Sequence, residues 1–167
     1  NHPVAATYFK RAAKDGKKLI IMDPRKQDLS RHAYNHLQFK PGKDVALLNA
    51  IIYTIIEEGL YDKQYVSSMT EGFEALKNNI SKFVPEEMEN ICGISADVIR
   101  DTARVYANSD KSIIFWGMGI SQHIHGTDNS RCLITLALIT GHIGRPGTGL
   151  HPLRGQNNVQ GASDAGL

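Results

Sequence analysis

The spacing of apolar residues along the chain predicts several amphipathic helices. Apolar side chains that recur every three or four positions fall on one face of a helix, and glycine or proline often marks its ends. We expect a long helix from Asp44, as its N-cap, to Gly59, and another that begins after Ser95 as its cap. Further helices are predicted over residues 3–15, 71–80, 85–91 and 127–140.

Three short segments are predicted to form strands. The first, residues 18–22, ends in a continuously apolar run that is typical of strands buried on both faces of a parallel sheet. The other two cover residues 35–39 and 112–116. Because helices separate the strands along the chain, the pattern predicts an α/β fold with the three strands parallel in one sheet.

Each predicted strand is followed by residues of loop type. In parallel sheets, ligands bind outside the carboxyl ends of the strands, so we expect the three loops to lie on one edge and to form a site. The loops are Asp23-Pro24-Arg25, Pro41-Gly42-Lys43-Asp44 and Gly117-Met118-Gly119.

The first loop pairs a carboxylate with a guanidinium. Pro24 fixes the backbone and so holds Asp23 and Arg25 in defined directions. A carboxylate can accept two hydrogen bonds from the N–H edge of a guanine, and an arginine can stack on a base or bind phosphate. A turn with a surface ion pair is the alternative interpretation.

The second loop opens the long helix. Exposed N–H groups at a helix start favour phosphate, but the carboxylate of Asp44 repels phosphate and suits ribose hydroxyls or a base better. Gly42 and Asp44 are also compatible with a tight turn followed by an N-cap and nothing more.

The third loop places glycines on both sides of Met118. Gly117 and Gly119 let a ligand approach the backbone closely, and Gln122 follows on the same segment. His123 and His125 form a possible metal pair, but the sequence shows no third ligand, so we predict no metal site.

The last motif is a dense run of amides between glycines, from Arg154 to Gly161. Amide groups donate and accept hydrogen bonds in fixed planes, which suits contact with a polar ligand. Gln156 is the candidate residue for such a contact. Arg154 can bind a small carboxylate through two parallel hydrogen bonds. A glycine-rich linker is the alternative.

Composition excludes several classes of partner. The formal charge of +2 is too small to indicate nucleic acid, and no apolar run reaches the roughly 18 residues of a membrane span. Cys92 and Cys132 occur without any CxxC motif, which predicts two buried thiols and mildly favours a reducing compartment.

We also expect the chain to be an internal piece of a longer protein, because it begins without Met and closes just after a glycine-rich stretch. Residues from about 144 onward are then expected to pack poorly. Exposure of Ile143, Leu150 and Leu153 would drive self-association.

Taken in order, these motifs resemble the large subunit of the formate dehydrogenases of the molybdopterin oxidoreductase superfamily. The likeness runs along essentially the whole chain without a gap. Its most specific motifs are WGMG with Gln122, TGHIGRPGTG from Thr140, and RGQNNVQG from Arg154.

The resemblance implies an enzyme that oxidises formate to carbon dioxide at molybdenum, or tungsten, held by two molybdopterin guanine dinucleotides. It implies iron–sulfur clusters elsewhere in the parent protein, NAD-reducing subunits as partners and a cytoplasmic location. It also implies an incomplete, three-layer, Rossmann-like dinucleotide-binding domain over residues 1–143. A glycine-rich segment over residues 144–167 would lead to the next domain and carry the active-site arginine.

The resemblance also implies roles for single residues. Arg154 matches the arginine that orients formate, and Gln156 matches a cofactor contact. The positions that match the family's guanosine-binding and pterin loops are Asp23, Arg25, Gly42, Asp44, Gly117, Met118, Gly119 and Gln122.

Two departures from the family pattern limit what this chain can do alone. The family's metal-ligating cysteine or selenocysteine and its iron–sulfur cysteines have no match here, and neither Cys92 nor Cys132 replaces them. We therefore expect the chain alone to be inactive. The alternatives are another enzyme of the superfamily, such as an assimilatory nitrate reductase, or a non-catalytic nucleotide-binding module. Arg154 favours a carboxylate substrate.

Overall fold

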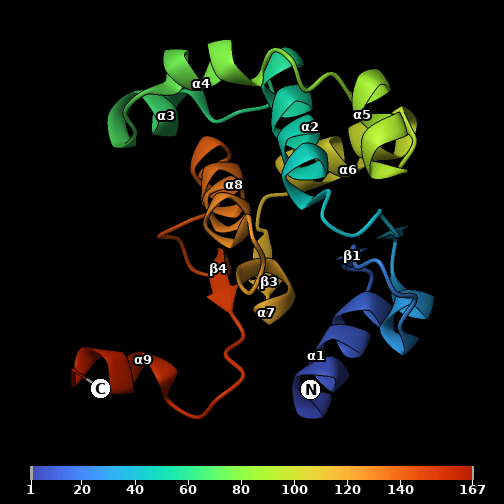
Figure 1. Ribbon diagram of the computed structural model, residues 1–167, viewed down its shortest axis with the longest axis vertical. Helices are drawn as coiled ribbons and strands as arrows, with labels where there is room; N and C mark the ends of the chain where they lie inside the picture. Colours follow the sequence, from blue (N-terminus) through green and yellow to red (C-terminus); the bar gives the residue numbers. More distant parts are fainter. Residues whose placement is uncertain (1, 167) are drawn as a thin grey trace.

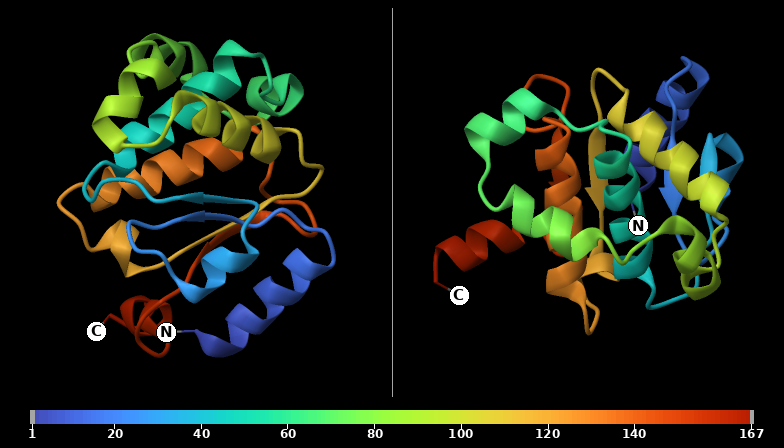
Figure 2. Two further views of the ribbon diagram at one scale, coloured as in Figure 1. Left: turned by 90° about the vertical axis from the view of Figure 1, so that its right-hand side faces the viewer. Right: turned by 90° about the horizontal axis from the view of Figure 1, so that it is seen from above.

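The structure, a computed structural model, describes residues 2–166. Its strands lie between helix α1 (Pro3–Lys14) on one side and helices α2 (Asp44–Glu57), α6 (Ala96–Ala107) and α8 (Gly126–Ile139) on the other (Figure 2, left). The α/β fold class with helices on both faces of parallel strands is therefore confirmed.

The strands form two separate parallel pairs. Strand β1 (Ile20–Met22) pairs with β2 (Asn35–Leu37), and β3 (Ile113–Trp116) pairs with β4 (Gly149–Pro152) (Figure 1). The prediction of one three-stranded sheet is wrong, because β3 takes β4 as its hydrogen-bonding partner. The apolar pattern does not reveal β4, which contains one glycine and one proline in four residues.

Shorter elements complete the chain. A 3-10 helix, η1, follows β1, and the others lie between or after the larger helices (Figure 1). They are η1 (Asp28–His32), α3 (Lys63–Met69), α4 (Phe73–Ile80), α5 (Pro85–Cys92), α7 (Met118–Ser121) and α9 (Val159–Asp164).

Helix α2 forms the centre of the core and contacts α4, α5, α6 and α8. Its predicted apolar face is buried: Leu47, Leu48, Ile52 and Ile55 are at most 1% exposed. Burial of each such side chain stabilises the fold by about 1.5–3 kcal/mol relative to an exposed one. Because α2 begins at Asp44, the last residue of the second predicted loop, this packing fixes where that loop ends.

Helix α1 covers the other side of β3 only in part. Phe9 of α1 lies 4.9 Å from Phe115 of β3, measured between ring centroids, and Phe115 stacks on His151 of β4 at 5.2 Å. Val4 and Tyr8, which belong to the predicted apolar stripe of α1, remain exposed. The stripe therefore contacts the strands through one aromatic residue near its middle.

The two predicted helix caps differ from the structure. Lys43 occupies the N-cap position of α2, and Asp44 is the first helical residue and is buried. Ser95 does occupy the N-cap position of α6, but its side chain makes no capping bond. The carboxylate of Glu89 on α5 accepts the hydrogen bond from the N–H of Ala96 instead, at 3.0 Å.

The segment after residue 144 packs poorly over most of its length, as predicted, because none of residues 144–166 is buried. The part around β4 is the exception. Strand β4 completes a parallel ladder with β3, and Leu150 packs against the core. Ile143 and Leu153 are half-buried. These three apolar residues are therefore not exposed, and that expectation is wrong. Self-association stays a prediction, but the exposure of these residues no longer supports it.

Within residues 2–166, no helix combines the length and the apolar character that crossing a membrane requires.

Candidate functional site

A small cavity lies where the third loop meets the segment that follows β4. It has a volume of about 150 Å³. The β3–β4 register, with Trp116 opposite Pro152, brings these two distant segments together. The predicted site residues that line this cavity are Gly117, Met118, Gln122, Arg154 and Gln156.

The backbone of the third loop is open at its glycines. A Cβ added to Gly119 would meet nothing within 4 Å, and one added to Gly117 would meet only the Leu153 carbonyl oxygen at 3.9 Å. Gly155 differs, since a Cβ there would lie 2.8 Å from the sulfur of Met118. The glycines therefore leave backbone accessible on one side of the cavity and let Met118 pack on the other.

Two residues that the sequence analysis did not single out shape the third loop. A Cβ on Gly126 would lie 2.0 Å from the carbonyl oxygen of Ser121, so only glycine fits there. The fully buried amide of Asn129 donates to the carbonyl oxygen of Ile120 at 3.0 Å. The HGTDN stretch contains both residues, but their contacts arise from the packing of α7 on α8, and no local pattern in the sequence predicts them.

The first predicted loop is a closed turn. The carboxylate of half-buried Asp23 accepts a hydrogen bond from the backbone N–H of Arg25 at 2.7 Å and a second one from the amide of Gln27. The amide of Gln38 donates to the carbonyl of Pro24 at 3.0 Å and so ties the loop to the end of β2. The guanidinium of Arg25 lies on the surface.

The second and third loops are neighbours. Gly42 has a φ of 77°, a conformation that favours glycine, and a Cβ there would lie 3.7 Å from the ring of His123. The Nδ1 atom of His123 accepts a hydrogen bond from the N–H of His125 at 3.2 Å. The ring of His123 therefore brings the third loop close to the second. Asp44 follows Gly42 by two residues in the sequence, and its side chain is buried, at 7% exposed.

The described part of the chain contains no group of three or more His, Cys, Asp or Glu side chains that could hold a metal ion. Cys92 and Cys132 are free and buried, as predicted. Burial raises the pKa of the Cys132 thiol to about 11, and burial also raises the pKa of Cys92. Both thiols are therefore protonated at neutral pH and are poor nucleophiles.

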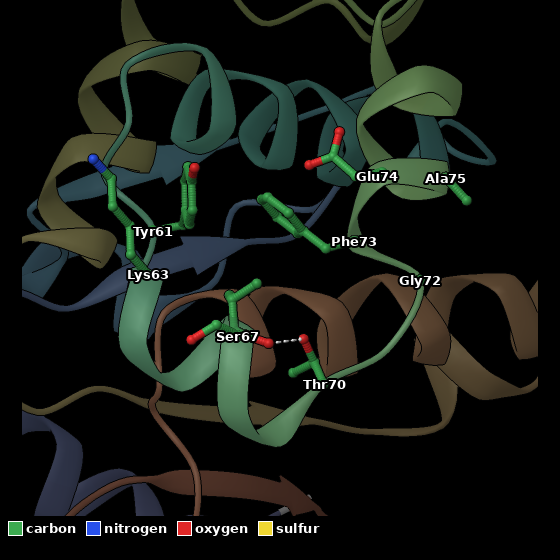
Figure 3. Close-up of a pocket in the computed structure, with 9 residues that line it drawn as sticks. Tyr61, Lys63, Ser67, Thr70, Gly72, Phe73, Glu74 and Ala75 are labelled. Carbon is green, nitrogen blue, oxygen red and sulfur yellow. Dashed lines mark hydrogen bonds between the residues drawn. The ribbon is translucent and has the colours of Figure 1, made fainter.

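A larger hollow between α3 and α4 lies apart from the predicted residues (Figure 3). It measures about 520 Å³. Tyr61 and Phe73 line it with ring centroids 4.8 Å apart. None of the predicted site residues lines it, and its two charged side chains, Lys63 and Glu74, stand on separate helices.

The whole chain, residues 1–167, matches the protein family described as Molybdopterin oxidoreductase. It is 46% identical over 166 residues to formate dehydrogenase H of Escherichia coli. It is also 46% identical over 165 residues to the F420-dependent formate dehydrogenase subunit alpha of Methanocaldococcus jannaschii. Each match covers 99% of this chain but only 23% and 24% of those two proteins.

A solved structure is similar as well. Acetylene hydratase from Pelobacter acetylenicus superposes with a TM-score of 0.78 at 32% sequence identity, over 83% of this chain and 19% of that one. The match covers most of the α/β architecture described above, so other proteins build the same arrangement of helices and short strands.

Proposed function

This chain belongs to the molybdopterin oxidoreductase family, and from that premise we propose that it is part of the catalytic subunit of a formate dehydrogenase. Formate dehydrogenases are the relatives at 46% identity. Because the chain spans about a quarter of their length, the activity belongs to a longer protein. The chain alone is inactive under this proposal, since none of its residues matches the family's metal-ligating cysteine or selenocysteine.

The observation that carries the proposal is the position of Arg154. It lies at the cavity beside Gly117 and Met118, on the segment that leaves β4. Its guanidinium is exposed and makes one long hydrogen bond, from Nη2 to the Gln160 amide oxygen at 3.4 Å. Several N–H donors therefore remain available to a small anion.

Formate fits such a group by shape as well as by charge. A guanidinium and a carboxylate form two parallel hydrogen bonds, and arginine stays charged at any working pH. In the proposed enzyme, Arg154 binds formate and orients it beside the third loop. Correct orientation of a bound substrate lowers the barrier because less freedom is lost in the reaction itself.

The residues of the three loops fit a molybdopterin guanine dinucleotide. The uncovered backbone of Gly117 and Gly119, with Met118, Gln122 and Gln156, would hold its pterin and pyrophosphate end. The cofactor, with molybdenum or tungsten, supplies the redox chemistry when bound, and the protein supplies position and electrostatics.

The guanosine end would reach the first and second loops. Asp23 and Arg25 would hold the base, and Gly42 and Asp44 would hold the ribose. Binding of the base by Asp23 requires Gln27 to release one oxygen of the Asp23 carboxylate. The ring of His123 beside Gly42 supports this arrangement, because it brings the third loop close to the second.

Further parts of the proposal concern the rest of the protein. The electrons would leave through iron–sulfur clusters in other domains toward NAD-reducing partner subunits in the cytoplasm. These points rest on the sequence resemblance, and the division at residue 143 between the dinucleotide-binding domain and the next segment rests on it too. Purification of the native complex, with assays for iron, formate-dependent NAD reduction and associated subunits, tests them together.

The test of Arg154 uses the full-length protein that contains this chain. Loss of charge-assisted hydrogen bonds, which contribute about 1.5–3 kcal/mol each, should lower kcat/KM for formate about 10- to 100-fold or more in Arg154→Ala. Arg154→Lys keeps the charge and should lose less. Metal and pterin content, measured on the same samples, should stay at the wild-type level.

A matched control is Arg131→Ala, because Arg131 is exposed on α8 and pairs only with Asp128 at 3.7 Å. It should leave formate kinetics unchanged. Normal formate turnover in a cofactor-replete Arg154→Ala enzyme would sink the assignment, and loss of cofactor together with activity would leave Arg154 a structural role.

The similarity to acetylene hydratase supports a second candidate, another reaction on the same cofactor-binding fold. The two differ in one measurement. A formate dehydrogenase reduces an artificial electron acceptor when formate is added, and an enzyme for a different substrate does not.

A further inference from the structure

The glycine-rich segment before β4 is fastened by the guanidinium of Arg145. Its Nε donates to the carbonyl oxygen of Gly141 at 3.0 Å, and its Nη2 donates to the carbonyl oxygen of Asp110 at 3.1 Å. The same Nη2 lies 3.4 Å from Nδ1 of His142. One side chain therefore bridges this segment and the connection between α6 and β3.

His142 extends the bridge into the core. It is 2% exposed, and its Nε2 lies 3.2 Å from the carbonyl oxygen of Tyr106 near the end of α6. A neutral ring with the proton on Nε2 donates to Tyr106 and accepts from Arg145 at Nδ1, so both contacts form at once. The ring also packs edge-on against Tyr106, with centroids 5.2 Å apart.

Further hydrogen bonds link these contacts to the start of β4. The N–H of Thr148 donates to the carbonyl of Arg145 at 3.1 Å, and the N–H of Gly149 donates to the carbonyl of Ser112 at 3.4 Å. Gly149 has a φ of 141°, which side chains other than hydrogen rarely allow. The path into β4 is thus fixed at the amino end of β3.

The β3–β4 ladder alone specifies its register weakly. It pairs only four residues, and Pro152 contributes no N–H. In the observed register, the N–H of Leu153 donates to the carbonyl of Trp116 at 2.6 Å, and Arg154 follows beside Gly117. A slip by one residue would move Arg154 by about 3.3 Å along the strand and turn side chains to the opposite face.

We propose that Arg145 and His142 form a clasp that sets the register of β4 on β3 and so positions Arg154 at the cavity. They act as positioning residues at the opposite end of the strand from the site. The inference rests on the proposed function only where it concerns formate, because the clasp and the register are properties of this chain.

The first test measures hydrogen exchange of backbone amides in the full-length protein. Arg145→Gln removes the charge and the planar guanidinium with its several N–H donors. Arg145→Lys keeps the charge and is the milder change, for use if the glutamine variant does not fold. Exchange over residues 149–154 should become at least about tenfold faster in Arg145→Gln, and less so in Arg145→Lys. Arg131→Gln, with its exposed side chain on α8, should leave this segment unchanged.

The second test is a double-mutant cycle on formate kinetics. With Arg154 present, Arg145→Gln should lower kcat/KM for formate about tenfold at normal cofactor content. In an Arg154→Ala background, the same substitution should lower it less than about twofold, because there is no guanidinium left to misplace. A merely structural effect of Arg145 would reduce activity equally in both backgrounds, and that result overturns the positioning role.

The two tests separate the failure of the clasp from the failure of the proposed function. Unchanged exchange over residues 149–154 in Arg145→Gln overturns the clasp, whatever the kinetics show. Faster exchange together with normal formate kinetics in Arg154→Ala rejects the role of Arg154 in formate oxidation and supports the clasp as the device that sets the strand register.

Discussion

At the scale of single residues, Gly126 controls the shape of the third loop. Its backbone lies against the carbonyl of Ser121, and a Cβ would lie 2.0 Å from that oxygen. Gly126→Ala should therefore shift the backbone of both α7 and α8 and destabilise the chain by about 2 kcal/mol, a typical cost of overpacking. Urea-induced unfolding measures this change.

Gly119→Ala provides the matched comparison in the same loop. A Cβ at Gly119 meets nothing within 4 Å, so its free energy of unfolding should stay within about 0.5 kcal/mol of the wild type. Equal destabilisation by the two substitutions would show that the close approach at Gly126 does not matter.

His142 gives the fold a dependence on pH. Burial lowers the pKa of His142 below its ordinary value, and the neighbouring Arg145 lowers it further. The hydrogen bond with the Tyr106 carbonyl and the carboxylates of Asp110 and Asp62 act in the opposite direction and raise this pKa in part. In the unfolded chain the ring gains its proton near pH 6.5, and in the folded chain only at lower pH. The stabilisation is therefore complete above about pH 6.5 and is lost as pH falls through the folded pKa.

The wild-type chain should lose stability between pH 7.5 and pH 5.5 by more than His142→Gln does. Urea midpoints at both pH values measure the difference. His125→Gln alters an exposed ring and should retain the wild-type dependence on pH. An identical slope for wild type and His142→Gln would contradict the assignment.

At the scale of elements, an ion-pair network joins α2, α5 and α6. Arg100 of α6 donates to Glu57 of α2 at 2.8 Å and to Glu86 of α5 at 3.1 Å, and its side chain is 19% exposed. The hydrogen bonds that Arg100 donates to the carboxylates of Glu86 and Glu57 raise the pKa of Arg100 further above its ordinary value. Arg104 lowers the pKa of Glu58 by a hydrogen bond in the same network.

Arg100→Met should weaken the packing of α6 on α2 and α5. We expect a loss of about 1–2 kcal/mol in the free energy of unfolding, smaller in 1 M salt than at low ionic strength. Arg11→Met is the control, because Arg11 is 85% exposed and lies 3.9 Å from Asp15. A loss that does not change with salt would indicate lost packing by the arginine stem and no ion-pair contribution.

The elements differ in how well their sequence predicts them. The apolar faces of α2 and α8 follow from periodicity. The apolar runs predict the strands β1 and β3 but not their burial, since Ile113 and Phe115 of β3 are 44% and 42% exposed. Helix α3 has a mixed polar sequence, yet Asp62 accepts a hydrogen bond from the N–H of Tyr65 at 2.9 Å, and this N-cap is a signal that local reasoning can find. Strand β4 gives no such local signal, since its order comes from pairing with β3.

The candidate site shows the same division. Glycine-rich loops after apolar runs are visible in the sequence, and the resemblance assigns Arg154 and Gln156. The meeting of Arg154 with Gly117 depends on a strand that periodicity does not predict. The approach of His123 to Gly42 and the hydrogen bond of Asn129 to Ile120 are tertiary features, which no local pattern contains.

At the scale of the whole molecule, the purified chain should show no formate-dependent reduction of an artificial electron acceptor. The described residues contain no metal-binding cluster, and the cavity at Arg154 measures only about 150 Å³. The full-length protein, assayed beside it with equal cofactor supply, should reduce the acceptor. Turnover by the isolated chain would contradict the need for the remaining domains.

The parallel pairing of β3 with β4 also sets the order in which the site can form during synthesis. Parallel strands need a long crossover, and here α8 and the clasp segment lie between the two strands. The third loop is therefore synthesised well before its partner strand, and closure of so long a loop is slow compared with helix formation. A nascent chain exposes an unpaired β3 edge until β4 has been synthesised and has paired with it, so the chain is most open to mispairing and to chaperone binding during this interval.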